Sequence, residues 1–273
     1  MKNKLSLVLI LPLFLSACSE TNNNPPAEST TPPAAVVPSI SYSFKEHQPH
    51  DTTSFTEGFL VKDGQLYEST GSPQDLLFTR SVFGPVDKTG KINVKGELDR
   101  NKYFGEGIVI LKDKLYQLTY KNRQGFVYDA KTFKKIKDFS YNNAEGWGLT
   151  TDGTYLIMSD GTSTLTYLDP ESLAVVKTVN VTEDGYQKQY LNELEYINGF
   201  IYANIWTTNH IVKIDPKTGN VTGKLDLDKV FTDAQNRYTK SIDMNGIAYD
   251  AQADKIYITG KLWPVIYELD FAH

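Results

Sequence analysis

One short phrase recurs five times along this 273-residue chain. Each copy has an acidic or amide-bearing turn with Gly, a few apolar residues, a tight turn, and then a strand built around a tyrosine. The five tyrosines are Tyr67, Tyr116, Tyr155, Tyr202 and Tyr257. Their separations of 49, 39, 47 and 55 residues correspond to the blades of a β-propeller rather than to the repeats of a helical solenoid. The repeat therefore predicts a five-bladed β-propeller.

Composition and local pattern also indicate an all-β fold. The chain has 17 Tyr and 13 Phe, and its many short alternating runs are separated by Gly, Asp and Asn. No long amphipathic helical pattern is present. Each of the first four repeats can be divided into four antiparallel strands, with Asp-Pro pairs such as Asp169-Pro170 marking turns.

The last repeat provides only three strands before the chain ends at His273. The segment from Ile40 alternates like a strand and precedes the first repeat. We expect it to pair beside residues 265–270, to supply the missing strand and to close the ring, because closure removes exposed sheet edges. Residues 40–273 are therefore predicted to form a single five-bladed propeller domain.

The N-terminus has the pattern of a secretory signal. Two lysines precede an apolar stretch over residues 5–15, which is too short to span a bilayer as a mature helix. Residues 15–18, Leu-Ser-Ala-Cys, resemble a bacterial lipobox, and Cys18 is the only cysteine of the chain. We therefore predict a signal peptide over residues 1–17 and lipidation of Cys18; a plain signal peptide with an incidental cysteine is the alternative.

Residues 18–39 carry the predicted lipid anchor and a tether rich in Thr, Asn, Pro, Ala and Ser. The protein is thus expected in the cell envelope, held to a bacterial membrane through its lipid only, as a monomer. Without residues 1–17 the chain has 26 basic and 33 acidic side chains, a formal charge of −7, so nucleic acid is not an expected partner.

Polar residues recur at one point of the repeat, where a propeller gathers equivalent loops around its channel. They are expected to converge with residues from the turns that leave each second strand. The first set includes Glu57, Glu106, Trp147, Glu193 with Asn192, and Asn245; the second includes Tyr120, Trp206, and Lys261 with Trp263. Aromatic walls, carboxylates, a lysine and amides suit a small ligand that carries both an amine and an amide. A carboxylate against such walls should have a raised pKa, as a general base for an amine requires.

Other chemistries find little support in the sequence. The four histidines show no metal-ligand spacing, and no second cysteine is available for a zinc site. No P-loop, dinucleotide fingerprint or nucleophile elbow occurs. We expect neither a metal at the site nor a cofactor, and a structural Ca²⁺ in the channel stays open. Acidic turns such as that at Asp160 are candidates for Ca²⁺, but their spacing is too loose to predict a site.

Seven short motifs in order resemble the glutamine cyclotransferase family, the plant and bacterial type of glutaminyl-peptide cyclotransferase. The motifs are HDTTSFTEGF from His50, FGEGI from Phe104, EGWGLTTDG from Glu145, LNELEYING from Leu191, the pair Ile205-Trp206, MNGIAYD from Met244 and TGKLWP from Thr259. The resemblance implies a five-bladed enzyme that converts the N-terminal Gln of peptides or proteins to pyroglutamate with loss of ammonia.

The resemblance also implies a role for each matching residue. Glu106 would be the general acid and base, and Glu57 would orient the amine or share its proton. Asn192 and Lys261 would hold the amide and its developing oxyanion. The pocket walls would be Phe55, Phe104, Trp147 and Trp206. Tyr120 stands where the family usually has Trp, which should alter affinity rather than abolish activity.

Two other classes of protein compete with this interpretation. The first is a non-catalytic propeller that binds peptides or glycans at the cell surface. The second is a metal-dependent lactonase-like propeller, whose channel also uses Glu and Asn. The joint presence of Glu106, Asn192, Trp206 and Lys261 favours the cyclase over the binder, and the scarcity of metal-like clusters disfavours the lactonase.

Overall fold

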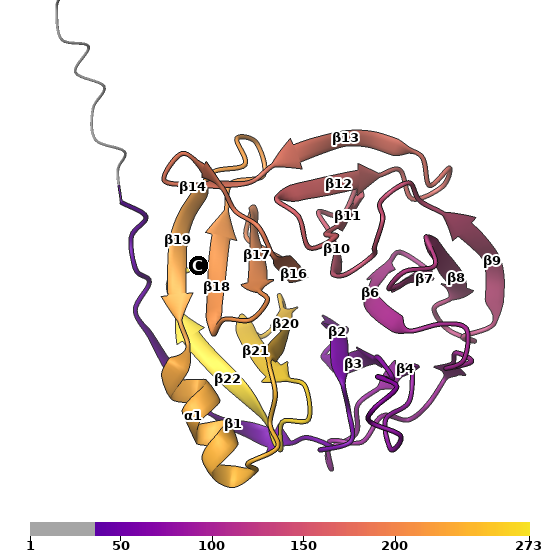
Figure 1. Cartoon of the computed structure of the whole chain (residues 1–273), viewed down its shortest axis with the longest axis horizontal. Helices are drawn as coiled ribbons and strands as arrows, with labels where there is room; N and C mark the ends of the chain where they lie inside the picture. Colours follow the sequence, from indigo (N-terminus) through magenta and orange to yellow (C-terminus); the bar gives the residue numbers. More distant parts are fainter. Residues whose placement is uncertain (1–35) are drawn as a thin grey trace, which may run out of the picture. The chain divides into compact units, whose positions relative to one another are not determined.

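The computed structural model describes residues 36–273. The predictions for the signal peptide, for Cys18 and for most of the tether therefore lie outside the described residues. Five four-stranded antiparallel sheets succeed one another along the chain and surround a common centre, which confirms the predicted five-bladed propeller (Figure 1).

The first four blades use consecutive strands. In each, the strand nearest the centre comes first, and β2, β6, β10 and β16 hold this place (Figure 1). The blades are β2 (Thr56–Lys62), β3 (Gln65–Thr70), β4 (Val82–Pro85) and β5 (Gly96–Glu97); β6 (Gly105–Leu111), β7 (Lys114–Thr119), β8 (Gln124–Asp129) and β9 (Lys135–Ser140); β10 (Leu149–Thr151), β11 (Leu156–Met158), β12 (Thr164–Leu168) and β13 (Val175–Asn180); and β16 (Leu191–Ile197), β17 (Phe200–Ile205), β18 (His210–Ile214) and β19 (Val221–Asp226). A small hairpin of β14 (Thr182–Glu183) and β15 (Tyr186–Gln187) follows the third blade.

The fifth blade combines both ends of the described chain. It contains β20 (Met244–Asp250), β21 (Lys255–Gly260) and β22 (Val265–Phe271), and its outermost strand is β1 (Tyr42–Pro49). β1 is antiparallel to β22, with Tyr42 opposite Phe271 and Pro49 opposite Val265. The predicted pairing of the N-terminal strand is therefore present. Pro38 and Ile40 also exchange backbone hydrogen bonds with Lys224 of the fourth blade, so contact with the blades begins before residue 40.

One helix was not expected from the sequence. α1 (Asp228–Arg237) lies between the fourth and fifth blades and accounts for the longest repeat spacing. It buries Val230 and Ala234 against the core of these blades, and Arg237 pairs with Glu46 of β1 at 2.7 Å. Two buried positions in ten residues make too short an amphipathic pattern to be distinguished from a loop.

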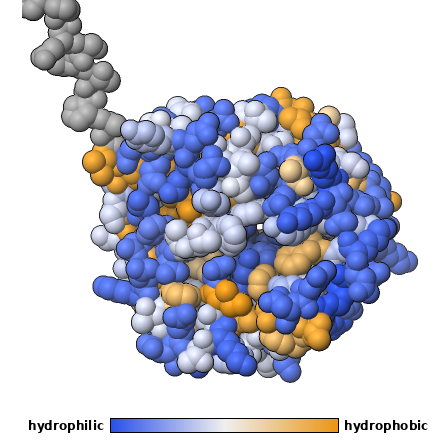
Figure 2. All heavy atoms as spheres, in the orientation of Figure 1, coloured by the Kyte–Doolittle hydropathy of each residue, from blue (hydrophilic) through white to orange (hydrophobic). Residues whose placement is uncertain are grey.

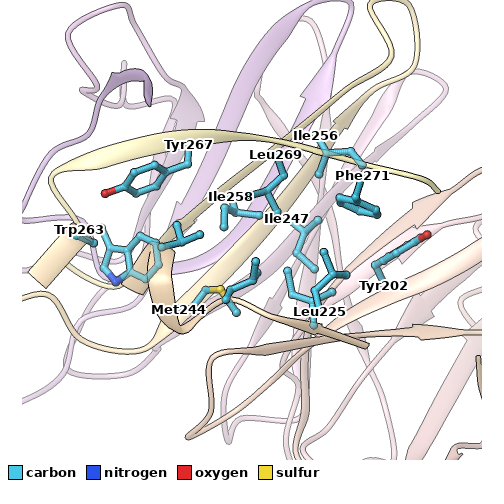
Figure 3. Packing of buried hydrophobic residues seen from close by; sticks show 14 of the residues in the cluster. Tyr202, Leu225, Met244, Ile247, Ile256, Ile258, Trp263, Tyr267, Leu269 and Phe271 are labelled. Atoms are coloured by element: carbon cyan, nitrogen blue, oxygen red, sulfur yellow. The ribbon is translucent and has the colours of Figure 1, made fainter. Parts of the chain in front are cut away.

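The core between the fourth and fifth blades is built from aromatic and branched side chains (Figure 3). Figure 3 shows Trp263 beside Met244 and Tyr267, and Phe271 near Tyr202. Trp263 is fully buried and donates its indole N–H to the carbonyl of Ile242 at 2.9 Å. The sequence grouped Trp263 with the site residues, but it faces the core, because the tight turn at Gly260 folds the indole beneath it.

Figure 2 shows that hydrophobic residues on the viewed face lie in separate patches among hydrophilic ones. Within residues 36–273 there is no helix whose length and apolar character would let it span a bilayer.

Candidate active site

Bulges at the start of the innermost strands place the polar residues of the repeat. In four blades the pairing of the first two strands shifts register at this point, between Thr56 and Gly58 in the first blade. The other shifts lie between Gly105 and Ile108, Leu191 and Leu194, and Met244 and Ile247. A bulge leaves a residue out of the ladder and re-aims its side chain. Each shift encloses a residue singled out in the sequence: Glu57, Glu106, Asn192 and Asn245.

Glycines beside these residues let the innermost strands approach one another. A Cβ on Gly58 would lie 2.6 Å from the backbone nitrogen of Ile108, and a Cβ on Gly148 would lie 2.2 Å from the carbonyl oxygen of Asn192. A side chain at either position would therefore push neighbouring blades apart. The recurrent Gly of the repeat is thus explained by blade packing around the channel.

A repeated backbone hydrogen bond joins the two sets of loops. In the four blades with a bulge, the first residue after the second strand donates its backbone N–H to a carbonyl oxygen. The acceptor lies two residues before the bulged residue, and the distances are 2.8–3.1 Å. The donor and acceptor pairs are Gly71 and Phe55, Tyr120 and Phe104, Trp206 and Tyr190, and Lys261 and Asp243. This bond holds the two sets of loops on one face of the propeller, as the sequence predicted.

A cavity of about 220 Å³ lies where these loops meet, and every blade contributes to its lining. All nine residues to which the family resemblance gave a catalytic or binding role line it, whereas Asn245, which the sequence grouped with them, does not. The nine are Phe55, Glu57, Phe104, Glu106, Tyr120, Trp147, Asn192, Trp206 and Lys261. Pro73 and Asp243 complete the lining.

Glu57 and Lys261 form a buried ion pair on the wall of this cavity. Glu57 Oε1 lies 3.0 Å from Lys261 Nζ, and Glu57 Oε2 accepts a hydrogen bond from Asn245 Nδ2 at 2.9 Å. Burial raises the pKa of Glu57 to about 7, although Lys261 opposes the shift. Burial disfavours charge on Lys261, but the carboxyl groups of Glu57 and Glu106 outweigh it and raise the pKa of the lysine. Lys261 also lies 4.7 Å from the centre of the Phe55 ring.

Glu106 is buried in the same cavity, but its carboxyl group is free. No side chain or amide within residues 36–273 donates a hydrogen bond to it, whereas both oxygens of Glu57 are engaged. Burial raises the pKa of Glu106 well above its usual range, and the nearby Glu57 raises it further against the opposing charge of Lys261. Glu106 is therefore the carboxyl group best placed to exchange a proton with a bound molecule.

Two sets of aromatic side chains form walls of the cavity. Phe55 stands edge-on to Phe104 at 6.1 Å, and Phe104 lies 5.7 Å from Tyr120. On the other side, Trp147 stands edge-on to Trp206 at 5.5 Å. Such walls exclude water and strengthen the electrostatic interactions of the charged groups between them.

Carboxylates hold both tryptophans. Trp147 donates its indole N–H to Glu145 at 2.9 Å, and Trp206 donates to Asp243 at 3.2 Å. Asp243 was not singled out from the sequence, although the repeat contained the signal. Asp243 precedes Asn245 by two residues, as Phe55 precedes Glu57 and Phe104 precedes Glu106. This shared position in the repeat is the signal in the sequence that marks Asp243 as a site residue.

Glu193 does not line the cavity, contrary to the grouping made from the sequence. Its carboxyl group lies deeper in the channel, where it accepts hydrogen bonds from the amides of Phe59 at 3.2 Å and Ile247 at 2.8 Å. Burial raises its pKa well above the usual range. Glu193 therefore joins the innermost strands of three blades rather than facing a ligand.

No group of three or more potential metal-ligating side chains occurs within residues 36–273. The Asp160 turn, a candidate for Ca²⁺, is occupied by protein donors: its carboxyl oxygens accept hydrogen bonds from Thr162 and from Asn143.

The fold and the cavity define a class of protein: a five-bladed propeller with a cavity at its channel that holds two buried carboxyl groups and a lysine. The model of one protein family, glutamine cyclotransferase, matches residues 10–271. The chain therefore belongs to the glutamine cyclotransferase family.

Two relatives agree with this membership. The chain is 40% identical over 224 residues to a glutaminyl-peptide cyclotransferase of Arabidopsis thaliana, which covers 81% of this chain and 68% of the relative. The crystal structure of Myxococcus xanthus glutaminyl cyclase superposes with a TM-score of 0.75 at 30% identity, covering 86% of this chain and 100% of that one.

Proposed function

We propose that this chain is a glutaminyl-peptide cyclotransferase that converts the N-terminal Gln of peptides or proteins to pyroglutamate and releases ammonia. Family membership and the two relatives support the activity. The observation that carries the mechanism is the contrast between two buried carboxyl groups: Glu57 is bound to Lys261 and Asn245, and Glu106 faces the cavity without a protein partner.

In this mechanism the Gln side chain lies between the aromatic walls, with its carboxamide oxygen toward Lys261 and Asn192. Both residues line the cavity, and the side chain of Asn192 makes no hydrogen bond within residues 36–273. As the α-amino nitrogen attacks Cδ, the carbon of the side-chain carboxamide, negative charge develops on this oxygen. Donors already in place stabilise that charge without reorganising.

Glu106 would carry the proton. Its carboxylate takes a proton from the α-amino group as the new C–N bond forms, and its carboxyl group then protonates the departing nitrogen as the old C–N bond breaks. Ammonia and the pyroglutamyl peptide result, and Glu106 returns to its starting state. A raised pKa helps both transfers, because it brings the proton affinity of the carboxylate closer to that of an amine. Every step uses side chains of the chain itself.

A coupled assay for ammonia tests this activity. The purified protein should release ammonia from a Gln-initiated peptide amide, and mass spectrometry should show the matching loss from the peptide. The same peptide with an acetylated N-terminus is the control, since it keeps the carboxamide but lacks the nucleophile. If the protein binds the free peptide without releasing ammonia, the non-catalytic binding propeller becomes the better interpretation.

We also propose that Cys18 carries a lipid and that the protein is attached to a bacterial membrane in the cell envelope. The support is the apolar stretch over residues 5–15, the Leu-Ser-Ala-Cys sequence and the polar tether after it. A single tether between anchor and propeller suits an enzyme that acts on peptides near that membrane.

Replacing Cys18 with Ser should move the protein from the membrane fraction to the soluble fraction and leave thermal unfolding unchanged, because the tether separates the anchor from the core. Fractionation and calorimetry measure the two effects. An unmodified Cys18 in membrane-bound wild-type protein, seen by intact mass, would rule out the lipid.

The pairing of β1 with β22 is proposed to close the ring. The segment after β1 supports this, since the amide of His50 donates to Pro264 at 2.9 Å and the amide of Leu262 donates to Ser54 at 2.8 Å. Buried His50 also bonds Glu68 of the first blade and the carbonyl of Trp263 in the fifth. The first and fifth blades are thus joined by main-chain and side-chain contacts.

Deleting residues 36–47 should lower the free energy of unfolding by about 2 kcal/mol or more, because Tyr42 and Phe44 lose their packing and the edge of β22 is exposed. Chemical denaturation measures the change. Removal of residues 1–34 is the matched control, and it should leave the free energy of unfolding unchanged. Equal stability of both truncated proteins would contradict ring closure by β1.

A further inference from the structure

A second cavity adjoins the active-site cavity on the side of the second blade. Its volume is about 490 Å³, and it lies between the loop after β3 and the segments that flank β6 and β7. The two cavities share Pro73, Phe104 and Tyr120. A peptide whose first residue occupies the active site can therefore continue into the second cavity along a shared wall.

The second cavity is lined by cations and by no carboxylate. Its charged lining residues are Arg100, Lys102 and Lys121, and its amides come from Gln74, Asn101 and Asn122. This is unusual in a chain whose formal charge is −5. A concave surface with one sign of charge attracts ligands of the opposite sign.

The three cationic side chains differ in the protein groups that they contact. Arg100 donates to the carbonyls of Pro73, Leu77 and Thr79, and so holds the loop that forms one wall. Lys121 lies 4.4 Å from the centre of the Tyr120 ring and 3.6 Å from Glu145.

Lys102 lies 4.8 Å from the centre of the Tyr103 ring and forms no ion pair within residues 36–273. Neither Arg100 nor Lys102 is paired with a carboxylate in that part of the chain, so both charges are available to a ligand. Lys102 also holds no loop in place, which makes it the better residue to test.

We propose that this cavity is a subsite for the peptide segment that follows the N-terminal Gln, and that it favours a carboxylate there. The inference rests on the proposed function, because it assumes that Gln occupies the first cavity. Each extended residue advances the chain by about 3.3–3.6 Å, and the two cavities share three lining residues, so they can hold consecutive residues of one extended peptide. An acidic side chain or the free C-terminus of a dipeptide supplies the carboxylate.

The test compares substrates that differ only in charge after Gln. With Gln-Glu, Gln-Gln and Gln-Lys dipeptide amides, kcat/KM should fall in that order, with about a threefold to tenfold difference between Gln-Glu and Gln-Lys. Added salt should reduce the difference, because the cations lie near solvent. Gln-Ala with a free or amidated C-terminus separates the two sources of the carboxylate.

Variants of Lys102 assign the preference to this cavity. Lys102→Met should reduce the ratio of kcat/KM for Gln-Glu over Gln-Lys, and Lys102→Glu should reduce it further or invert it. Lys62→Met is the matched control, since it removes one positive charge from β2 outside both cavities and should leave the ratio as in wild type. A wild-type ratio of one, or a ratio unchanged in Lys102→Glu, would overturn the subsite.

Binding measurements keep the subsite separate from the activity. Calorimetry on the Glu106→Gln variant gives dissociation constants for the same three dipeptide amides without turnover. If wild type releases no ammonia from any peptide but the ranking of affinities holds and depends on Lys102, the activity fails and the subsite stands. If ammonia is released from all three at equal rates and affinities are equal, the subsite fails and the activity stands.

Discussion

Replacing Glu106 with Gln should lower kcat by about 10²–10⁴ and change KM little. The amide keeps the size and burial of the carboxyl group but cannot accept the proton of the α-amino group or return it to the leaving nitrogen. The carboxyl group makes no hydrogen bond within residues 36–273, so the substitution breaks no protein contact. Steady-state kinetics with a Gln-initiated peptide amide and a coupled ammonia assay measure the effect.

Thermal unfolding of the variant is the control. The Glu106→Gln protein should be at least as stable as wild type, because burial raises the pKa of Glu106 and therefore makes its charged form costly in the folded state. A fully active variant would show that the proton travels through another group, and Glu57→Gln would then be the next substitution to test.

The pH dependence of wild type reports the same group. The base must be deprotonated, and burial together with the charge of Glu57 raises the pKa of Glu106 well above 4.5. We therefore expect kcat/KM to fall on the acid side at a pH well above 4.5. An acid limb at the pKa of an ordinary exposed carboxyl group would contradict the assignment.

Replacing Lys261 with Met should lower kcat by about 10²–10³, because the oxyanion loses its principal charged donor. The same change should lower the free energy of unfolding by about 3–5 kcal/mol. Glu57 would stay buried after losing the ammonium group that lies 3.0 Å from it in the wild type. Kinetics and chemical denaturation on one protein preparation measure both effects.

The loss of stability should depend on pH with a defined sign. In wild type the pKa of Glu57 is raised to about 7 from 4.5, so the folded state binds more protons and stability falls as pH rises through this window. Without Lys261 the pKa of Glu57 rises further. Destabilisation by Lys261→Met should therefore be larger at pH 8 than at pH 5.

A double variant separates the two roles of Lys261. Lys261→Met with Glu57→Gln removes the uncompensated charge, so it should recover most of the lost stability while kcat stays low. Recovery of kcat together with stability would mean that Lys261 acts only by neutralising Glu57 and not on the substrate.

The repeat in the sequence was sufficient to predict the number of blades and most of the cavity. Glu57, Glu106 and Asn192 lie at one register of the repeat, and a ring of blades brings one register to one place whatever the packing details. The unpaired strand of the last repeat likewise predicted the partner of β22, because an open sheet edge requires one.

The direction of individual side chains could not be predicted from the repeat in the sequence. Trp263 and Lys261 are two residues apart, yet Lys261 lines the cavity and Trp263 is buried in the core, because a tight turn after Gly260 separates them. Glu193 follows Asn192 directly but points down the channel to amides of the first and fifth blades. Inside a bulge the alternation of a strand no longer says which face a residue takes.

The local pattern of this chain specifies its blades, the order of its strands and the register of its polar residues, because each of these depends on neighbours in sequence. The distinction between a bound Glu57 and a free Glu106, the hydrogen bond from Trp206 to Asp243 and the cationic second cavity depend on contacts between blades. Those contacts join residues far apart in the chain, and their geometry exists only once the ring has formed.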